Sequence, residues 1–81
     1  MQNSAEIAVI GLGNAGLPLA AVIADSGIAV MGVDINESRC LAINRGDNPI
    51  AEEAGLEELL KRHGGRSLLA TPRFQDAAGC R

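Results

Sequence analysis

Aromatic side chains are almost absent from this chain. Phe74 is the only aromatic among 81 residues, and neither Trp nor Tyr occurs. Isoleucine, leucine, valine and alanine must therefore form nearly all of the core. Small aliphatic side chains allow helices to lie close to a sheet, as the layers of α/β proteins require. With apolar residues at 47%, the composition predicts one small globular domain.

Cysteine and basic clusters are also scarce. Cys40 and Cys80 lack CxxC spacing and make no disulfide framework, so we expect free thiols in a reducing cytoplasm. The net charge is −3, and the strongest basic cluster is only Lys61-Arg62. Nucleic-acid binding requires a basic face, so it is not expected here. The residues also predict no metal site.

A long apolar segment is present, but it is not typical of a membrane span. Residues 7–24 form an uncharged stretch of 18 residues. A stretch of this length is long enough to suggest a helix that spans a membrane. However, Gly11, Gly13, Gly16 and Pro18 interrupt the segment, and no Lys or Arg precedes it. We therefore predict that the chain does not enter a membrane.

The apolar pattern predicts alternating strands and helices. Strands are expected at residues 7–10, 29–33 and 67–71, and helices at 15–26, 37–45 and 53–63, with another helix beginning after Phe74. Asn36 is a suitable N-cap, and Gly27 and Gly46 suit helix ends. This alternation predicts a parallel sheet with right-handed crossovers.

A glycine-rich motif follows the first predicted strand. Its sequence, of the form GxGxxG, is Gly11-Leu12-Gly13-Asn14-Ala15-Gly16. It opens a helix and precedes Asp34 at the end of the second strand, which is the context of a dinucleotide-binding fingerprint. In such a motif the glycines allow a tight turn, close approach of a diphosphate and close helix packing. The helix N-terminus supplies N–H donors, while a carboxylate at Asp34 would bind the adenosine ribose and favour NAD over NADP.

These observations predict an α/β fold, a partial Rossmann fold whose three-stranded parallel sheet has the order 3-2-1 and is flanked by helices. Residues 1–81 would form the N-terminal part of a dinucleotide-binding domain, left incomplete. The first strand is central in a complete domain but would lie at an edge here. Because an exposed apolar edge invites pairing, we expect a homodimer through residues 7–10.

Three stretches resemble the N-terminal domain of the UDP-glucose/GDP-mannose dehydrogenase family. They are IAVIGLGNAGLPLAAVIADSG, VMGVDINESRCLAINRGDNPI and the E-x-G-L that ends at Leu56. The likeness runs from about Ile7 to Pro72. It implies NAD as cofactor and oxidation of a nucleotide-sugar C6 hydroxyl to a carboxylate, a reaction of polysaccharide biosynthesis.

The resemblance also implies roles for particular residues. The segment from Gly11 to Gly16 would bind the diphosphate, Asp34 the adenosine ribose, and Arg39 would lie near the adenine or the ribose. The family's catalytic cysteine lies in a later segment, so neither Cys40 nor Cys80 should be catalytic. The sugar would bind through further domains, and the 81-residue chain should be inactive alone.

The chain departs from the family pattern at two places. Asn14 and Ala15 stand where the family usually has an aromatic residue and Val, and Asn14 is expected to cap the following helix. The segment from Pro49 to Leu56 is one residue longer than the family's and lacks its second proline, so no role is assigned there.

Two alternatives stay open. The chain could be a stand-alone NAD- or ADP-binding module without catalysis. It could also open another NAD(P)-dependent enzyme, such as a hydroxyacid dehydrogenase, although the stretch DINESR argues against that.

Overall fold

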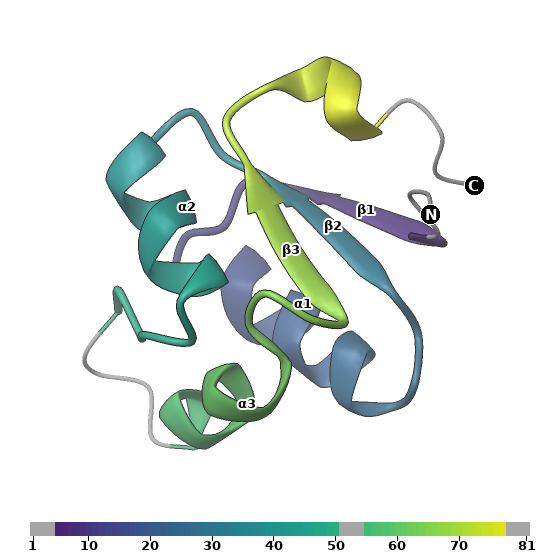
Figure 1. Ribbon diagram of the computed structural model, residues 1–81, viewed down its shortest axis with the longest axis vertical. Coiled ribbons are helices and arrows are strands. Elements are labelled where there is room, and N and C mark those ends of the chain that lie inside the picture. Colours follow the sequence, from purple (N-terminus) through teal and green to yellow (C-terminus); the bar gives the residue numbers. More distant parts are fainter. Residues whose placement is uncertain (1–4, 51–54, 78–81) are drawn as a thin grey trace.

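The described residues form seven short elements, and Figure 1 shows how these elements are arranged. The computed structural model describes residues 5–50 and 55–77. Along the chain the elements are β1 (Ile7–Ile10), α1 (Gly16–Asp25), β2 (Val30–Val33), α2 (Glu37–Asn44), α3 (Leu56–His63), β3 (Leu68–Thr71) and the 3-10 helix η1 (Phe74–Ala77). The predicted order of strands and helices is therefore confirmed, and the boundaries that fall within the described residues lie within a few residues of their predictions. The helix predicted after Phe74 is a 3-10 helix.

The sheet is parallel throughout and has the order β1-β2-β3, which confirms the predicted topology. In its register, Ile7 lies beside Val30, and Val30 beside Leu68. The carboxyl ends of the three strands converge (Figure 1). Because ligands of open α/β sheets bind outside the carboxyl ends of the strands, this is the end at which a site is expected.

The core lies on the face of the sheet that the three helices cover. Its strand residues are Val30, Leu68 and Ala70, with Val9 packed at its margin. The helices add fully buried aliphatic and alanine side chains from α1, α2 and α3: Leu17, Ala20, Ala21, Ala24, Ile43, Leu56 and Leu60. The prediction that aliphatic side chains form nearly all of the core is thus confirmed, and Cys40 is the non-aliphatic member of this cluster. The opposite face carries half-exposed Ile10 and Leu69, and η1 lies on that side of the strands (Figure 1).

The helix ends follow their local sequence in most places. The side chain of Asn36 accepts a hydrogen bond from the backbone N–H of Arg39 at 3.0 Å, so it caps α2 as predicted. Gly27 and Gly46 have φ of 99° and 83°, the left-handed conformation of a helix stop. α3 begins at Leu56, after Gly55; the earlier start predicted at Glu53 lies outside the described residues. The described helices include none that is both long and apolar enough to cross a membrane.

One side chain covers part of the outer edge of β3. The amide of Asn44 donates to the carbonyl of Ala70 at 2.8 Å and accepts from the N–H of Ala70 at 2.8 Å. Asn44 thus takes the place of a neighbouring strand at that residue, and an edge that is paired in this way is a poor template for another chain. The sequence pattern did not predict this contact.

A cluster of polar side chains connects α1, α3 and the residue before β3 at the amino end of the sheet. His63, the last residue of α3, shares hydrogen bonds with Asp25 at 2.9 Å and with the hydroxyl of Ser67 at 3.0 Å. Arg62 also donates to Asp25, at 3.3 Å. A histidine at the last position of a helix ordinarily complements the helix dipole. Here His63 also joins the end of α1 to Ser67, the residue before β3.

This cluster should make stability depend on pH. The hydrogen bond to His63, helped by the charge of Arg62, holds the pKa of the Asp25 carboxyl below its ordinary value of 3.8. A carboxyl with a depressed folded-state pKa stabilises the fold above its unfolded pKa, and the benefit is lost as pH falls through the folded value. Asp25→Asn should therefore lower the free energy of unfolding at neutral pH, and the difference from the wild type should vanish in acid. Urea unfolding across the acid range measures this.

The exposed carboxyl of Glu57 on α3 provides the control, since Glu57→Gln should change stability little at any pH. A constant difference between Asp25→Asn and the wild type at every pH would contradict the proposed role of the Asp25 charge.

Candidate functional site: an amide-lined turn beside a carboxylate

The glycine-rich turn leaves β1 at its carboxyl end. Gly11 has φ of 89°, a conformation that favours glycine, and its N–H still donates to the carbonyl of Val33 at 2.7 Å. The next residue, Leu12, is fully buried, and its side chain lies where a Cβ on Gly32 of β2 would be. The turn is therefore anchored on β2 by a backbone hydrogen bond and by a buried side chain.

Gly13 and Gly16 differ in what surrounds them. A Cβ on Gly13 would meet nothing within 4 Å, so the space beside this residue is open. A Cβ on Gly16 would overlap the carbonyl oxygen of Gly11 and touch Val9. Gly16 therefore allows close packing, as expected, but its closest neighbour is the turn itself. Gly13 is the glycine whose missing side chain leaves room for a ligand.

The start of α1 presents unpaired amides. The first amide bonded in helical fashion is that of Leu17, which donates to the carbonyl of Gly13 at 3.1 Å. Within residues 5–50 and 55–77, the N–H groups of Gly13, Asn14, Ala15 and Gly16 have no acceptor. Unpaired donors at a helix N-terminus form an anion-binding surface.

The predicted cap by Asn14 is wrong. The N-cap residue of α1 is Ala15, and no side chain caps the helix. Ala15 has φ of −99° and ψ of −42°, whereas a side-chain cap normally requires an extended N-cap residue. Because no side chain satisfies them, the amides stay open to a ligand.

Asp34 directly follows β2, and its carboxylate faces the turn. One oxygen of its carboxylate, Oδ2, accepts from the N–H of Leu12 at 2.8 Å, and Oδ1 accepts from the N–H of Asn36 at 2.9 Å. These two backbone hydrogen bonds, Asn36 first, lower the pKa of Asp34 below its ordinary value. The group is therefore a fixed anion at neutral pH, and its side chain is only 10% exposed.

Arg39 reaches back from α2 to the same carboxylate. Its Nη1 donates to Oδ2 of Asp34 at 3.2 Å, and its side chain is 31% exposed. The guanidinium is thus an ion-pair partner at the candidate site rather than a solvated helix residue. The structure brings together the turn, Asp34 and Arg39, as the sequence predicts.

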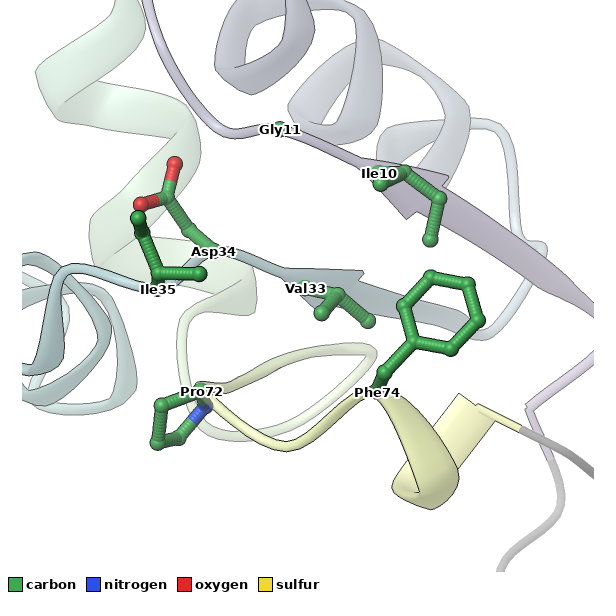
Figure 2. A pocket seen from close by; sticks show the side chains of 7 residues that line it. All are labelled: Ile10, Gly11, Val33, Asp34, Ile35, Pro72 and Phe74. Carbon is green, nitrogen blue, oxygen red and sulfur yellow. The ribbon is translucent and has the colours of Figure 1, made fainter.

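An apolar cavity of about 250 Å³ adjoins Asp34. Figure 2 shows the ring of Phe74 beside Ile10 and Val33, with the carboxylate of Asp34 at the other end and Ile35 close to it. Pro72 and Gly11 complete the lining. Ile35 is 91% exposed although it is large and apolar. Sequence reasoning missed these lining residues; the one available hint was that Phe74 is the only aromatic residue.

The remaining candidate groups do not form a reactive site. The thiol of Cys40 donates to the backbone carbonyl of Asp34 at 3.3 Å. Burial raises its pKa, which disfavours the reactive thiolate. Cys80 lies outside the described residues. The described part of the chain holds no group of three or more His, Cys, Asp or Glu that could bind a metal.

The close contact at Gly16 yields a stability prediction. Gly16→Ala should lower the free energy of unfolding by about 1–3 kcal/mol, since the added methyl overlaps a backbone carbonyl that has little freedom to move. Gly13→Ala, in open space, should stay within about 0.5 kcal/mol of the wild type. Equal stabilities for the two variants, measured by urea unfolding, would show that the turn is not packed in this way.

The sequence of this chain is similar to those of known proteins. The model of the UDP-glucose/GDP-mannose dehydrogenase family, NAD binding domain, matches residues 5–79. A UDP-N-acetyl-D-mannosamine dehydrogenase of Methanococcus vannielii is 52% identical over 60 residues, 74% of this chain and 14% of that protein. A UDP-glucose 6-dehydrogenase of Haloferax volcanii is 39% identical over 71 residues, 88% of this chain and 16% of that protein.

A solved structure has a similar fold. The crystal structure of a ternary complex of GDP-mannose dehydrogenase from Pseudomonas aeruginosa superposes with a TM-score of 0.80 at 39% identity, over 89% of this chain and 16% of that one. The chain therefore spans about one seventh to one sixth of the length of these three proteins.

Proposed function

Because the chain belongs to the UDP-glucose/GDP-mannose dehydrogenase family and carries its NAD-binding domain, we propose that it holds the ADP half of NAD for a nucleotide-sugar 6-dehydrogenase. The observation that carries this proposal is the set of four unpaired amides at the start of α1, beside the fixed carboxylate of Asp34. The cofactor of this domain is NAD.

The residues present fit the parts of the ADP group. The diphosphate would lie on the amides between Gly13 and Gly16, where the missing Cβ of Gly13 leaves the space open. An anion is favoured there because the helix dipole adds partial positive charge. The acidic chain therefore needs no lysine at this point.

The ribose would bind at Asp34, but few acceptor positions of this carboxylate are free. A carboxylate offers about four acceptor positions, two on each oxygen. Oδ2 already accepts from Leu12 and Arg39, while Oδ1 accepts only from Asn36. One ribose hydroxyl can therefore donate to Oδ1 directly, and a second must displace Arg39. The adenine would occupy the apolar cavity, where Ile35 and Phe74 can cover its faces.

Bound NAD supplies the hydride acceptor of the proposed reaction, the oxidation of a sugar C6 hydroxyl to a carboxylate. The described residues bind and orient its ADP half. None of them places a nucleophile or an acid–base pair at the turn, and the Cys40 thiol is buried. In this proposal the sugar and the catalytic groups belong to other parts of a cytoplasmic enzyme. A stand-alone NAD- or ADP-binding module would use the same turn.

The open space at Gly13 provides a direct test. Gly13→Ala should weaken the binding of NAD and ADP by tenfold or more while leaving the unfolding transition unchanged, because its methyl would stand where the diphosphate approaches. Isothermal titration with both ligands measures the change. Ser38→Ala, on the exposed side of α2, should bind like the wild type. Unchanged affinity in Gly13→Ala would place the diphosphate elsewhere and defeat the proposal.

The two sheet edges differ in a way that supports self-association of the 81-residue chain through β1. The N–H groups of Ile7 and Gly11 point toward β2, so by the two-residue period of a strand those of Ala8 and Ile10 point outward. Asn44 covers the β3 edge at Ala70, and no comparable side chain covers β1 within the described residues. We propose that two copies pair along β1.

Removing one outward donor should weaken this association. Ala8→Pro deletes an N–H at the edge, where proline is tolerated in strands. Sedimentation equilibrium over a concentration series should show a dimer for the wild type and a shift toward monomer for the variant, with unchanged circular dichroism. A wild type that stays monomeric at the highest concentration would refute pairing through β1.

A further inference from the structure

Three large apolar side chains that water can reach line the cavity beside Asp34. They are Ile10, Ile35 and Phe74, and each is more than half exposed. Exposed apolar side chains gathered around a hollow are typical of a binding surface. Figure 2 shows the ring of Phe74 against Ile10 on one side of this cavity. Because the ring is 66% exposed, its position depends on the backbone segment that carries it.

A closed set of hydrogen bonds holds that segment on the end of β3. The hydroxyl of Thr71 donates to Oδ2 of Asp76 at 2.6 Å and accepts from the backbone N–H of Arg73 at 3.1 Å. The guanidinium of Arg73 donates to both oxygens of the Asp76 carboxylate, at 3.3 Å and 3.1 Å. We call Thr71, Arg73 and Asp76 the clasp. Its members lie before and after Phe74 in the sequence, so the ring projects from a closed loop of contacts.

The clasp is anchored in the sheet by a buried group. Thr71 is the last residue of β3 and is only 7% exposed. A buried hydroxyl is rarely left without a hydrogen-bond partner, and both hydrogen bonds of this hydroxyl lie within the clasp. The hydrogen bonds from Thr71 and then Arg73 also hold the pKa of the Asp76 carboxyl below its ordinary value. The carboxylate is therefore charged at neutral pH and keeps its pairing with Arg73.

We infer that Thr71, Arg73 and Asp76 are positioning residues, which hold the ring of Phe74 as a fixed wall on which the base of a bound nucleotide stacks. The inference rests on the proposed function, because it is the bound ADP half that brings a base to this cavity. None of the three clasp residues lines the cavity. They therefore act on the ligand through Phe74.

Thr71 also connects this wall to the carboxylate that would bind the ribose. Its carbonyl accepts a hydrogen bond from the backbone N–H of Asp34 at 3.1 Å. The side chain of Thr71 thus holds the segment of Phe74, while its backbone holds the residue at the other end of the cavity. A site whose parts are already in place loses less entropy on binding than one that must be ordered. The clasp therefore contributes to affinity without touching the ligand.

The position of the ring can be measured directly. Phe74 and His63 are the only residues with ring protons in the aromatic region of a proton NMR spectrum, since the chain has no Trp or Tyr. Nuclear Overhauser effects from the Phe74 ring to the methyl groups of Ile10 and Val33 should be present in the wild type. They should be lost in Thr71→Val, which keeps the buried volume but removes the hydroxyl.

Two further variants complete this measurement. Asp76→Ala removes the carboxylate of the clasp and should also abolish the effects between the ring and the methyl groups. Asp47→Ala is the matched control. It removes an exposed carboxylate that pairs with Arg45 at 3.5 Å and does not line the cavity, so the ring should keep its contacts.

The effect on binding is measured as the ratio of ADP to UDP affinity. The two ligands share the ribose and the diphosphate and differ in the size of the base, so a general loss of affinity leaves the ratio unchanged. Stacking of a base on an aromatic ring is strong enough for the wild type to prefer ADP by about tenfold. Thr71→Val and Asp76→Ala should reduce this ratio to about threefold or less, whereas Thr71→Ser, which keeps the hydroxyl, should restore it.

A double variant distinguishes action through Phe74 from a general structural role. Phe74→Ala should reduce the ratio by itself, and the combination of Phe74→Ala with Asp76→Ala should reduce it no further, because changes at residues that act through one another are not additive. Isothermal titration of the 81-residue chain supplies the affinities, and circular dichroism checks that each variant folds. If Thr71→Val or Asp76→Ala does not fold, Asp76→Asn, which lacks the charge that pairs with Arg73, should lower the ratio by a smaller factor.

The outcomes separate the inference from the proposed function. A wild type that binds neither ADP nor NAD would overturn both. If the wild type binds ADP but the folded clasp variants keep the wild-type ratio, the role of the clasp is overturned and the proposed function stands. Contacts of the ring that persist in Thr71→Val and Asp76→Ala would likewise overturn it, and so would a further loss in the double variant.

Discussion

The hydrogen bond from the N–H of Leu12 to Oδ2 of Asp34 is the contact on which the site depends. It joins the turn after β1 to the end of β2 across 22 residues of sequence. The side chain of the same Leu12 is fully buried against Gly32 of β2. Backbone and side chain of one residue therefore fix the turn on a single neighbouring strand. This attachment leaves the next amides of the turn unpaired and facing outward.

The contact also explains how an acidic chain can bind an anion. The chain has a net charge of −3, and a lone carboxylate beside the turn would repel a diphosphate. Arg39 pairs with that carboxylate, so the local charge is near zero where the donors are exposed. The attraction for the diphosphate then comes from oriented backbone dipoles. These dipoles are part of the fold, and they need no flexible side chain to be ordered on binding.

Contacts that depend on periodicity and local conformation were predictable from the sequence. The parallel sheet and its order followed from apolar runs separated by helices, because crossover connections have one hand. The cap by Asn36 was predictable because it depends only on the residues next to it in the sequence. The predicted cap by Asn14 is wrong because Ala15 takes the N-cap position in a non-extended conformation. The GxGxxG motif located the turn and Asp34, and the family resemblance located Arg39. Contacts between distant segments were not predictable.

Two such contacts show why. Asn44 bonds the backbone of Ala70, which is 26 residues away, and His63 bonds Asp25 across 38 residues. Neither contact produces a repeating pattern in the sequence, because each depends on how three elements pack together. The cavity beside Asp34 was missed for a related reason, because it forms only when η1 brings Phe74 over Ile10 and Val33.

Polar groups at the two ends of the sheet have different roles. This difference explains how the chain can keep unpaired hydrogen-bond donors and still fold. At the amino end, His63 satisfies the side chains of Asp25 and Ser67 within the protein. At the carboxyl end, the amides of the turn are left for a ligand, and unpaired groups of this kind contribute nothing to folding. The fold tolerates them because they are exposed rather than buried, and the core that supports them lies beneath Leu12. Stability and binding therefore rest on different residues, which is why a substitution at Gly13 can separate the two while one at Gly16 cannot.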